Sequence, residues 1–268
     1  FNALTGHIPD ELSGATSLTS LCLNKNQLVG SIPDIFQPLS RLDTLRLGDN
    51  LYSFHPIPSS IYSLEYLSEL NLQDSRLKND IAPEIGNLLS LVILRLDNND
   101  LSEKLPSEIG ELTSLTTLRI EGNLLTGSIP DEIGNLSLLE DFRLYLNGFT
   151  STLPEAIGNL VSLRRLQYDQ NSIEGPIPET IGNLKKLELL WCSDNLISGG
   201  LPESMGDLSS LVDFQCFRNR FSDSGRLGIS GTIPASLGLL QNLKIFAVFQ
   251  NSLRGEIPPT LGVLESLE

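Results

Sequence analysis

The sequence predicts an α/β solenoid, in which short coils stack and one parallel β-sheet runs along one side. Three observations lead to this fold class. A phrase recurs with a period of about 24 residues, leucine supplies 54 of the 268 residues, and aromatic residues make up only 6%. A unit of this length cannot bury its apolar side chains alone, but stacked copies share one continuous core.

The repeats form a single array over residues 1–268, with a partial repeat at 1–17 followed by ten repeats. Eight of the ten have 24 residues, the one from Leu42 has 25 and the one from Leu211 has 32. They open at Leu18, Leu42, Leu67, Leu91, Leu115, Leu139, Leu163, Leu187, Leu211 and Leu243. We interpret the insertion in the long repeat, at about 222–228, as a small flap that is neutral decoration rather than a functional element. Because the chain begins within the pattern, we expect it to be a segment of a longer protein.

The first half of each repeat predicts a strand and a bend. In the repeat from Leu115, apolar and charged residues alternate over 118–121, which indicates a short strand with one face inward. Asn123 follows, where the chain must turn, and its amide can both donate and accept hydrogen bonds at a buried bend. We expect nine such asparagines to form a column, with Ser75 as the one substitute: Asn26, Asn50, Asn99, Asn123, Asn147, Asn171, Asn195, Asn219 and Asn251.

The second half of each repeat predicts an irregular return. Gly127 permits a backbone conformation that other residues resist, and Pro130 ends strand pairing. Ile133 and Leu136 then supply the apolar contacts of the return side. The remaining length allows only about one turn of helix, which we expect to be of the 3-10 type.

Composition narrows the possible functions. The chain has 18 Lys and Arg against 33 Asp and Glu, a net charge of −15, which argues against binding to a nucleic-acid backbone. It has only His7 and His55, no metal-ligand spacing and no glycine-rich phosphate loop, so we expect no catalytic site, no metal and no cofactor. No apolar run is long enough for a membrane span, so we expect no membrane contact by this segment.

The phrase L-x-x-L-x-L-x-x-N-x-L-x-G-x-I-P-x-x-I-G-x-L resembles the plant-type leucine-rich repeat over essentially the whole chain. The resemblance implies a right-handed superhelix with the parallel sheet on the concave side and short 3-10 or irregular turns on the convex side. It also implies that ligands bind on the strand side, because the family includes receptor-kinase ectodomains, receptor-like proteins and secreted inhibitors of cell-wall-degrading enzymes. The chain departs from the pattern at Ala82, which replaces proline, and at Asn79, Glu103 and Ser151, which replace glycine.

The chain has three cysteines, which cannot form a closed disulfide framework. Cys192 and Cys216 lie 24 residues apart at equivalent inward positions, so their Cα atoms should be near enough for a disulfide. We nevertheless expect both to be free and buried as small apolar side chains. Cys22 is expected to face outward. Asn135 opens an acceptor triplet for glycosylation, which has meaning only if the chain is secreted.

The outward strand positions are the informative ones for function, because the fold does not dictate them. Arginine and aromatic residues, which binding hot spots favour, gather there. The candidate ligand-binding residues are Arg95, Arg119, Arg143, Tyr145, Arg165, Trp191, Phe217 and Phe249. For the arginines, neutralisation by Asp97 and Glu121 on neighbouring strands explains the pattern about as well as ligand binding does.

These residues predict a protein- or peptide-binding domain, the extracellular or cell-surface recognition segment of a receptor-like protein or receptor kinase. A secreted inhibitor that uses the same concave face is the alternative. Ice binding would need ranks of Thr or other small residues, whereas the outward columns are charged and uneven. Flanking sequence would separate the first two, since a receptor continues into a membrane span.

Overall fold

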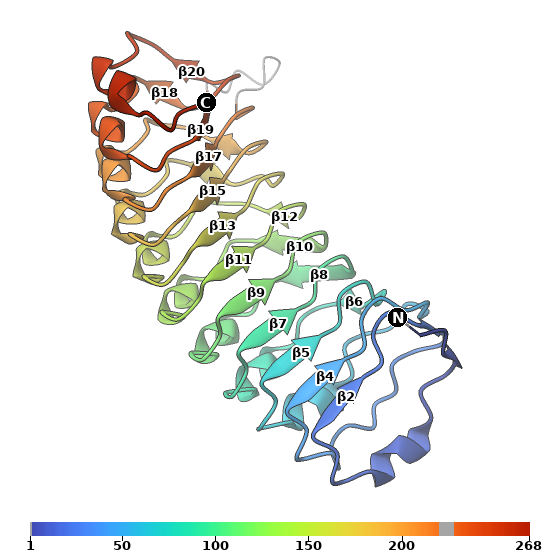
Figure 1. The fold of residues 1–268 in the computed structure, drawn as a ribbon. Helices are drawn as coiled ribbons and strands as arrows, with labels where there is room; N and C mark the ends of the chain where they lie inside the picture. Colours follow the sequence, from blue (N-terminus) through green and yellow to red (C-terminus); the bar gives the residue numbers. More distant parts are fainter. Residues whose placement is uncertain (1, 220–227) are drawn as a thin grey trace.

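The computed structural model describes residues 2–219 and 228–268, which form a curved solenoid with the chain ends at opposite ends of the stack (Figure 1). The predicted flap at about 222–228 therefore lies, except for Gly228, outside the described residues. A ten-stranded parallel sheet runs along the whole stack. Its strands are β2 (Ser20–Cys22), β4 (Thr44–Arg46), β5 (Glu69–Asn71), β7 (Ile93–Arg95), β9 (Thr117–Arg119), β11 (Asp141–Arg143), β13 (Arg165–Gln167), β15 (Leu189–Trp191), β17 (Asp213–Gln215) and β19 (Ile245–Ala247).

Neighbouring strands pair in register across one full repeat. Leu118 of β9 lies beside Leu94 of β7 on one side and Phe142 of β11 on the other. All three side chains are completely buried, because the middle residue of each strand points into the solenoid. The core therefore continues from coil to coil, as the repeat predicts. Phe246 in the last strand is only partly buried.

Short 3-10 helices form the return side of the coils, where Figure 1 shows them in a row away from the sheet. Each has five residues, and most begin directly after the proline of the repeat. They are η1 (Asp10–Gly14), η2 (Ser59–Ser63), η3 (Pro83–Asn87), η4 (Ser107–Glu111), η5 (Asp131–Asn135), η6 (Glu155–Asn159), η7 (Glu179–Asn183), η8 (Glu203–Asp207), η9 (Ala235–Leu239) and η10 (Pro259–Val263). Among the described residues no helix is long and apolar enough to cross a membrane.

A second line of short strands follows the bend, and the sequence analysis did not predict it. β6 (Lys78–Asn79), β8 (Asp100–Lys104), β10 (Leu124–Gly127) and β12 (Gly148–Phe149) form a four-stranded sheet. Three two-stranded sheets continue the line: β1 (Thr5–Gly6) with β3 (Gln27–Leu28), β14 (Glu174–Gly175) with β16 (Leu196–Ile197), and β18 (Ser230–Gly231) with β20 (Ser252–Leu253). The expectation of a single sheet was incomplete, because stacking also aligns the backbone after each bend and leaves its amides free to pair.

The asparagine column sits between these two lines of strands. The Asn123 side chain is buried, and its Nδ2 donates to the carbonyls of Leu96 at 3.0 Å and Ile120 at 3.1 Å. Its Oδ1 accepts the amide of Leu101 on the preceding coil at 3.0 Å. One side chain thus satisfies backbone groups of two coils, which is the role that the repeat assigns to it.

The two inward cysteines correct one prediction. Cys192 and Cys216 form a disulfide, with Cα atoms 4.7 Å apart, so the expectation of two free thiols was wrong. The reason is the in-register pairing of β15 with β17, which carries the residues just after the two strands to the same depth and within disulfide range. Cys22 is free and exposed, as expected.

Candidate ligand-binding face

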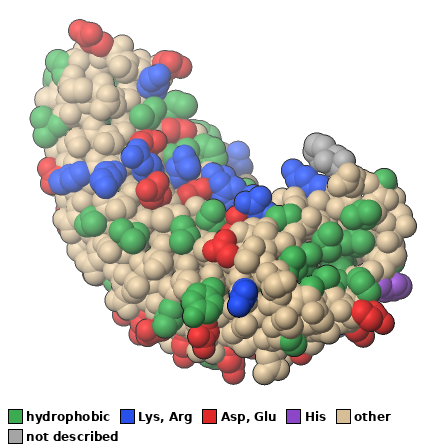
Figure 2. Space-filling view, turned by 60° about the horizontal axis from the view of Figure 1, so that its bottom comes forward, with side chains coloured by type: hydrophobic (Ala, Val, Ile, Leu, Met, Phe, Trp, Pro, Cys, Tyr) green, Lys and Arg blue, Asp and Glu red, His purple; other side chains and the backbone are tan. Residues whose placement is uncertain are grey.

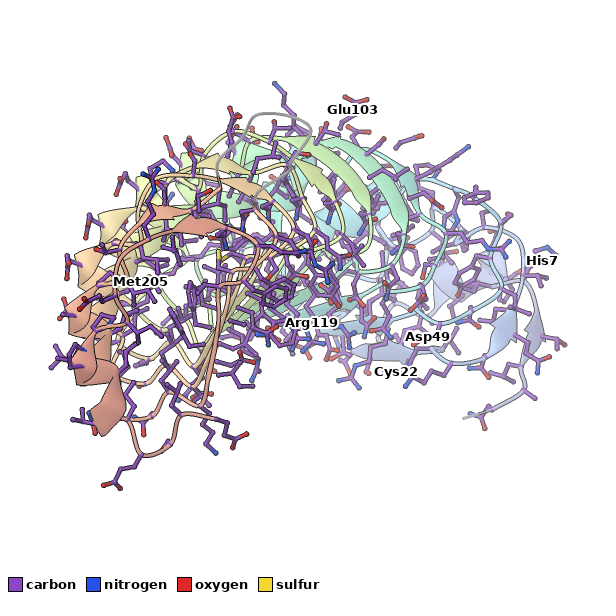
Figure 3. All side chains as sticks on the ribbon, turned by 90° about the horizontal axis from the view of Figure 1, so that it is seen from above. His7, Cys22, Asp49, Glu103, Arg119 and Met205 are labelled. Carbon is purple, nitrogen blue, oxygen red and sulfur yellow. A yellow bond between two sulfur atoms is a disulfide. The ribbon has the colours of Figure 1, made fainter. Side chains whose placement is uncertain are left out.

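The outward residues of the ten-stranded sheet line the inner side of the curve. A row of Lys and Arg side chains crosses this side in Figure 2, with Asp and Glu side chains between them. Figure 3 places Arg119 on the opposite side of the ribbon from Glu103, and Met205 with the 3-10 helices of the return side. The first and third residues of each strand both point to this inner face, since side chains alternate along a strand.

Asp141 holds the arginine row together. Its carboxylate accepts hydrogen bonds from Arg119 Nη2 at 2.7 Å and Arg143 Nε at 2.8 Å, and Arg165 Nε lies 3.5 Å away. The side chain is only 4% exposed. Burial opposes its ionisation, but the bonds from Arg143 and Arg119 outweigh burial and lower the pKa of Asp141. Three guanidinium groups therefore surround one ionised carboxylate.

Self-neutralisation of the arginine row occurs, but not through the predicted pairs. Asp97 accepts a hydrogen bond from Arg95, two residues earlier on the same coil, at 3.2 Å rather than from an arginine across the sheet. Glu121 makes no ion pair within the described residues, although it lies in the same column. The sequence analysis missed Asp141, which is the first residue of β11. The alternation that places Arg143 on the inner face also places Asp141 there, so the signal was present.

Two carboxyl groups on this face, those of the buried Glu121 and the half-buried Asp169, each have a buried oxygen with no hydrogen-bond partner among the described residues. Glu121 is 5% exposed and its Oε2 has no partner among the described residues. Burial, the largest effect, raises the pKa of Glu121 to about 7, against the lowering effects of its own backbone amide and of Arg143 and Arg119. Burial likewise raises the pKa of Asp169 to about 6, and Asp194 contributes to the rise. Both groups change charge near neutral pH on the face that carries the candidate residues.

Half of the eight candidate residues meet at a hollow of about 370 Å³ on this face. Four of them, Arg143, Tyr145, Arg165 and Trp191, line it. The other lining residues are Gln167, Asp169 and Leu189, which the sequence analysis did not propose. Arg119 lies one strand away behind Asp141, and Arg95 is paired on β7, so neither lines the hollow.

The aromatic residues are ordered by specific contacts. Trp191 is half-buried outside the core, and its Nε1 donates to Asp213 Oδ2 at 3.0 Å, which fixes the plane of the indole beside the hollow. Phe217 and Phe249 stack with centroids 4.4 Å apart and planes 9° apart. The Arg218 guanidinium lies 5.2 Å from the Phe217 centroid. The two phenylalanines therefore form a separate platform further along the stack.

Comparison with known proteins places these repeats in a family. The Leucine Rich Repeat family model matches residues 17–39, 90–112, 114–136 and 186–208. The ectodomain of the Arabidopsis receptor kinase HAESA, solved with the peptide hormone IDA and the co-receptor SERK1, is 33% identical with a TM-score of 0.93. That alignment covers 99% of this chain and 43% of HAESA.

Two further solved structures show the range of the fold. The plant peptide hormone receptor RGFR1, solved with RGF2, is 36% identical with a TM-score of 0.86, over 100% of this chain and 46% of the receptor. A plant ice-binding protein is 27% identical with a TM-score of 0.66, over 99% of this chain and 77% of that protein. This chain spans less than half the length of the two receptors. It is an array of plant-type leucine-rich repeats, as its repeated phrase predicts, with the fold of receptor-kinase ectodomains.

Proposed function

We propose that this chain is part of the extracellular recognition segment of a receptor-like protein or receptor kinase, and that it binds a peptide or protein segment on the inner face. The observation that carries the proposal is the hollow beside Asp141, where cationic and aromatic side chains converge on a concave surface. Recognition sites combine such rigid rings with a few directed polar groups. The similarity to HAESA and RGFR1, which were solved with peptide hormones, supports the same reading.

Arg165 is the proposed anchor for an acidic group of the ligand. The carboxylate nearest to it, on Asp141, already accepts hydrogen bonds from Arg119 and Arg143. The Arg165 side chain makes no hydrogen bond with any described residue, although its buried Nε lies 3.5 Å from Asp141 Oδ1 as a longer ion pair. Its guanidinium can therefore form the paired hydrogen bonds that a ligand carboxylate accepts. Arg143 is held by Asp141 and acts by its charge and position.

Tyr145 and Trp191 are the proposed apolar contacts. Both are rigid side chains that offer a large contact area with little loss of conformational entropy on binding. The bond from Trp191 to Asp213 preorganises the indole, which reduces the free-energy cost of ordering it on binding. Phe217 and Phe249 extend the contact along the stack for a longer ligand. Arg95 and Arg119 contribute to the positive potential of the face rather than direct contacts.

The extracellular location is part of the proposal. A disulfide between Cys192 and Cys216 suits an oxidising compartment. Asn135 is exposed at the end of η5, where an acceptor triplet would be accessible to glycosylation. We infer that this segment acts by binding rather than by catalysis. The comparisons do not favour the alternative of a secreted inhibitor, because HAESA and RGFR1 are receptors that were solved with peptide hormones. A membrane span in the full-length sequence would test the receptor reading.

The proposal is tested by selecting linear peptides from a random display library on the protein and measuring their affinity for variants. Trp191→Ala and Arg165→Ala should each weaken binding by about 2 kcal/mol, roughly thirtyfold, because each removes a central contact. Glu84→Ala, at an exposed position on η3, is the matched control and should leave affinity unchanged. Selected peptides that bind both inner-face variants normally, or that depend on Glu84, would refute the proposed site.

A further inference from the structure

One position in each coil is forced into the left-handed backbone region. It directly precedes the asparagine column or, once, Ser75, and its φ lies between 47° and 63° in all ten repeats. The residues are Lys25, Asp49, Asp74, Asn98, Gly122, Leu146, Gln170, Asp194, Arg218 and Gln250. Nine of the ten are polar residues or glycine, and Leu146 is the one apolar side chain.

The stack imposes this conformation on Leu146, whatever its side chain. Its amide donates to the carbonyl of Asp169 on one neighbouring coil at 3.2 Å, and its carbonyl accepts the amide of Asn123 on the other at 3.1 Å. A leucine in the left-handed region is disfavoured, because its Cβ crowds the backbone there, whereas asparagine and glycine tolerate it. The stack would therefore hold together at least as well with a residue of the usual kind.

Burial does not compensate Leu146 for this strain. The side chain is 50% exposed, and it lies outside the buried core and the apolar side chains that pack against it. On the preceding coil the equivalent position is Gly122, which has no side chain to cover it. A strained residue whose side chain is half exposed and outside the core is the kind of feature that functional contacts explain.

We propose that Leu146 is a specificity-determining contact of the inner-face site, which receives an aliphatic or aromatic side chain of the bound peptide. This inference rests on the proposed function, because Leu146 directly follows Tyr145, which lines the hollow. A peptide in extended conformation that reaches from Arg165 across Tyr145 would next meet the exposed isobutyl group. Gly122 on the preceding coil has no side chain of its own, and the Asn98 side chain lies over it, so the equivalent positions on the two preceding coils are glycine and a polar residue.

The first measurement needs no ligand. Leu146→Asn keeps the left-handed preference and removes the apolar surface, and Gln170→Asn makes the same change at the neighbouring exposed position of the column. Urea denaturation should show that Leu146→Asn unfolds at the same or a higher urea concentration than the parent protein. A clear fall in the midpoint, absent in Gln170→Asn, would show that Leu146 is a structural contact and would overturn the inference.

The second measurement uses peptides that are selected from a random linear library and lose binding on Trp191→Ala. Leu146→Asn should weaken them about tenfold or more, and Gln170→Asn should change affinity by less than about twofold. Peptides selected on the parent protein should also share an apolar residue at one position. Peptides selected on Leu146→Asn should not share it. Peptides that need Trp191 but ignore Leu146 would defeat this inference and leave the proposed function standing. If the library yields no peptide that loses binding on Trp191→Ala, the proposed function fails and this inference fails with it.

Discussion

The role of a single residue in this solenoid depends on which repeated position it occupies. Asn99 shows this beside Ser75, the one position where the asparagine column has another residue. Its Oδ1 accepts the amides of both Ser75 and Leu77, at 2.9 and 3.0 Å, and so supplies an acceptor at the bend where Ser75 stands in for asparagine. The asparagine column could be predicted because its chemistry repeats with the period. Ser75 itself keeps one of the usual bonds of the column, because its Oγ donates to the carbonyl of Gln73 at 3.2 Å.

Removing one member of the column should destabilise two coils. We expect Asn123→Ala to lower the free energy of unfolding by about 1–3 kcal/mol, because the buried amide of Leu101 loses its acceptor and the carbonyl of Leu96 keeps only one of its two side-chain donors, Asn99. Urea denaturation checks this. Asn24→Ala, which changes an asparagine outside the column, is the control and should have a smaller effect. Equal effects of the two changes would contradict the role assigned to Asn123.

Glu121 should make stability depend on pH. Its pKa is raised from the ordinary value of 4.5 to about 7 in the folded protein, so folding favours the neutral carboxyl. The free energy of unfolding should therefore fall as the pH rises from about 4.5 to about 7. Glu121→Gln should remove about 1–3 kcal/mol of that fall, whereas Glu155→Gln, an exposed change on η6, should not. Parallel pH profiles for the parent and Glu121→Gln would contradict this account.

At the scale of elements, the strands were predictable and their lateral partners were not. Alternation over residues such as 118–121 indicates a strand, and the period sets its register with the next coil. The alternation does not predict a strand at Leu124–Gly127 (β10). Its short pairing with β12 depends on how tightly the coils stack rather than on side-chain type. The disulfide was missed for a related reason. Spacing placed Cys192 and Cys216 correctly, but only the final separation of the coils decides bonding.

Glycine is the fourth residue of eight of the ten 3-10 helices described, and it sets the distance between neighbouring coils. A Cβ on Gly158 of η6 would lie 2.5 Å from the carbonyl oxygen of Thr180 on the next coil, which is backbone and cannot move aside. We expect Gly158→Ala to destabilise the fold by about 1–3 kcal/mol, because the coils must separate. Gly262→Ala is the matched control, since nothing lies within 4 Å of its Cβ. Thermal unfolding of both variants tests this, and a Gly158→Ala protein as stable as Gly262→Ala would contradict it.

At the scale of the whole molecule, the positions that build the fold can be told from the positions on the inner face by how strictly they repeat. The columns that build the core and the bend are nearly uniform, so the sequence alone predicts the solenoid. The inner face varies from coil to coil, as the change from Arg143 to Gln167 to Trp191 on three adjacent strands shows. Sequence predicted which residues point there. It could not predict the hollow, because that depends on Asp141 drawing the arginines together and on Asp213 fixing the indole.

The most direct test of the inner-face site is hydroxyl-radical footprinting with and without a selected peptide. The method reads the solvent exposure of individual side chains, and aromatic rings react readily. Oxidation of Tyr145 and Trp191 should fall several-fold when the peptide binds, because both line the hollow. Tyr66, which is 66% exposed and lies beyond η2 on the return side, should react equally in both samples. Protection of Tyr66 with unchanged oxidation of Tyr145 and Trp191 would place the ligand on the opposite side and contradict the account.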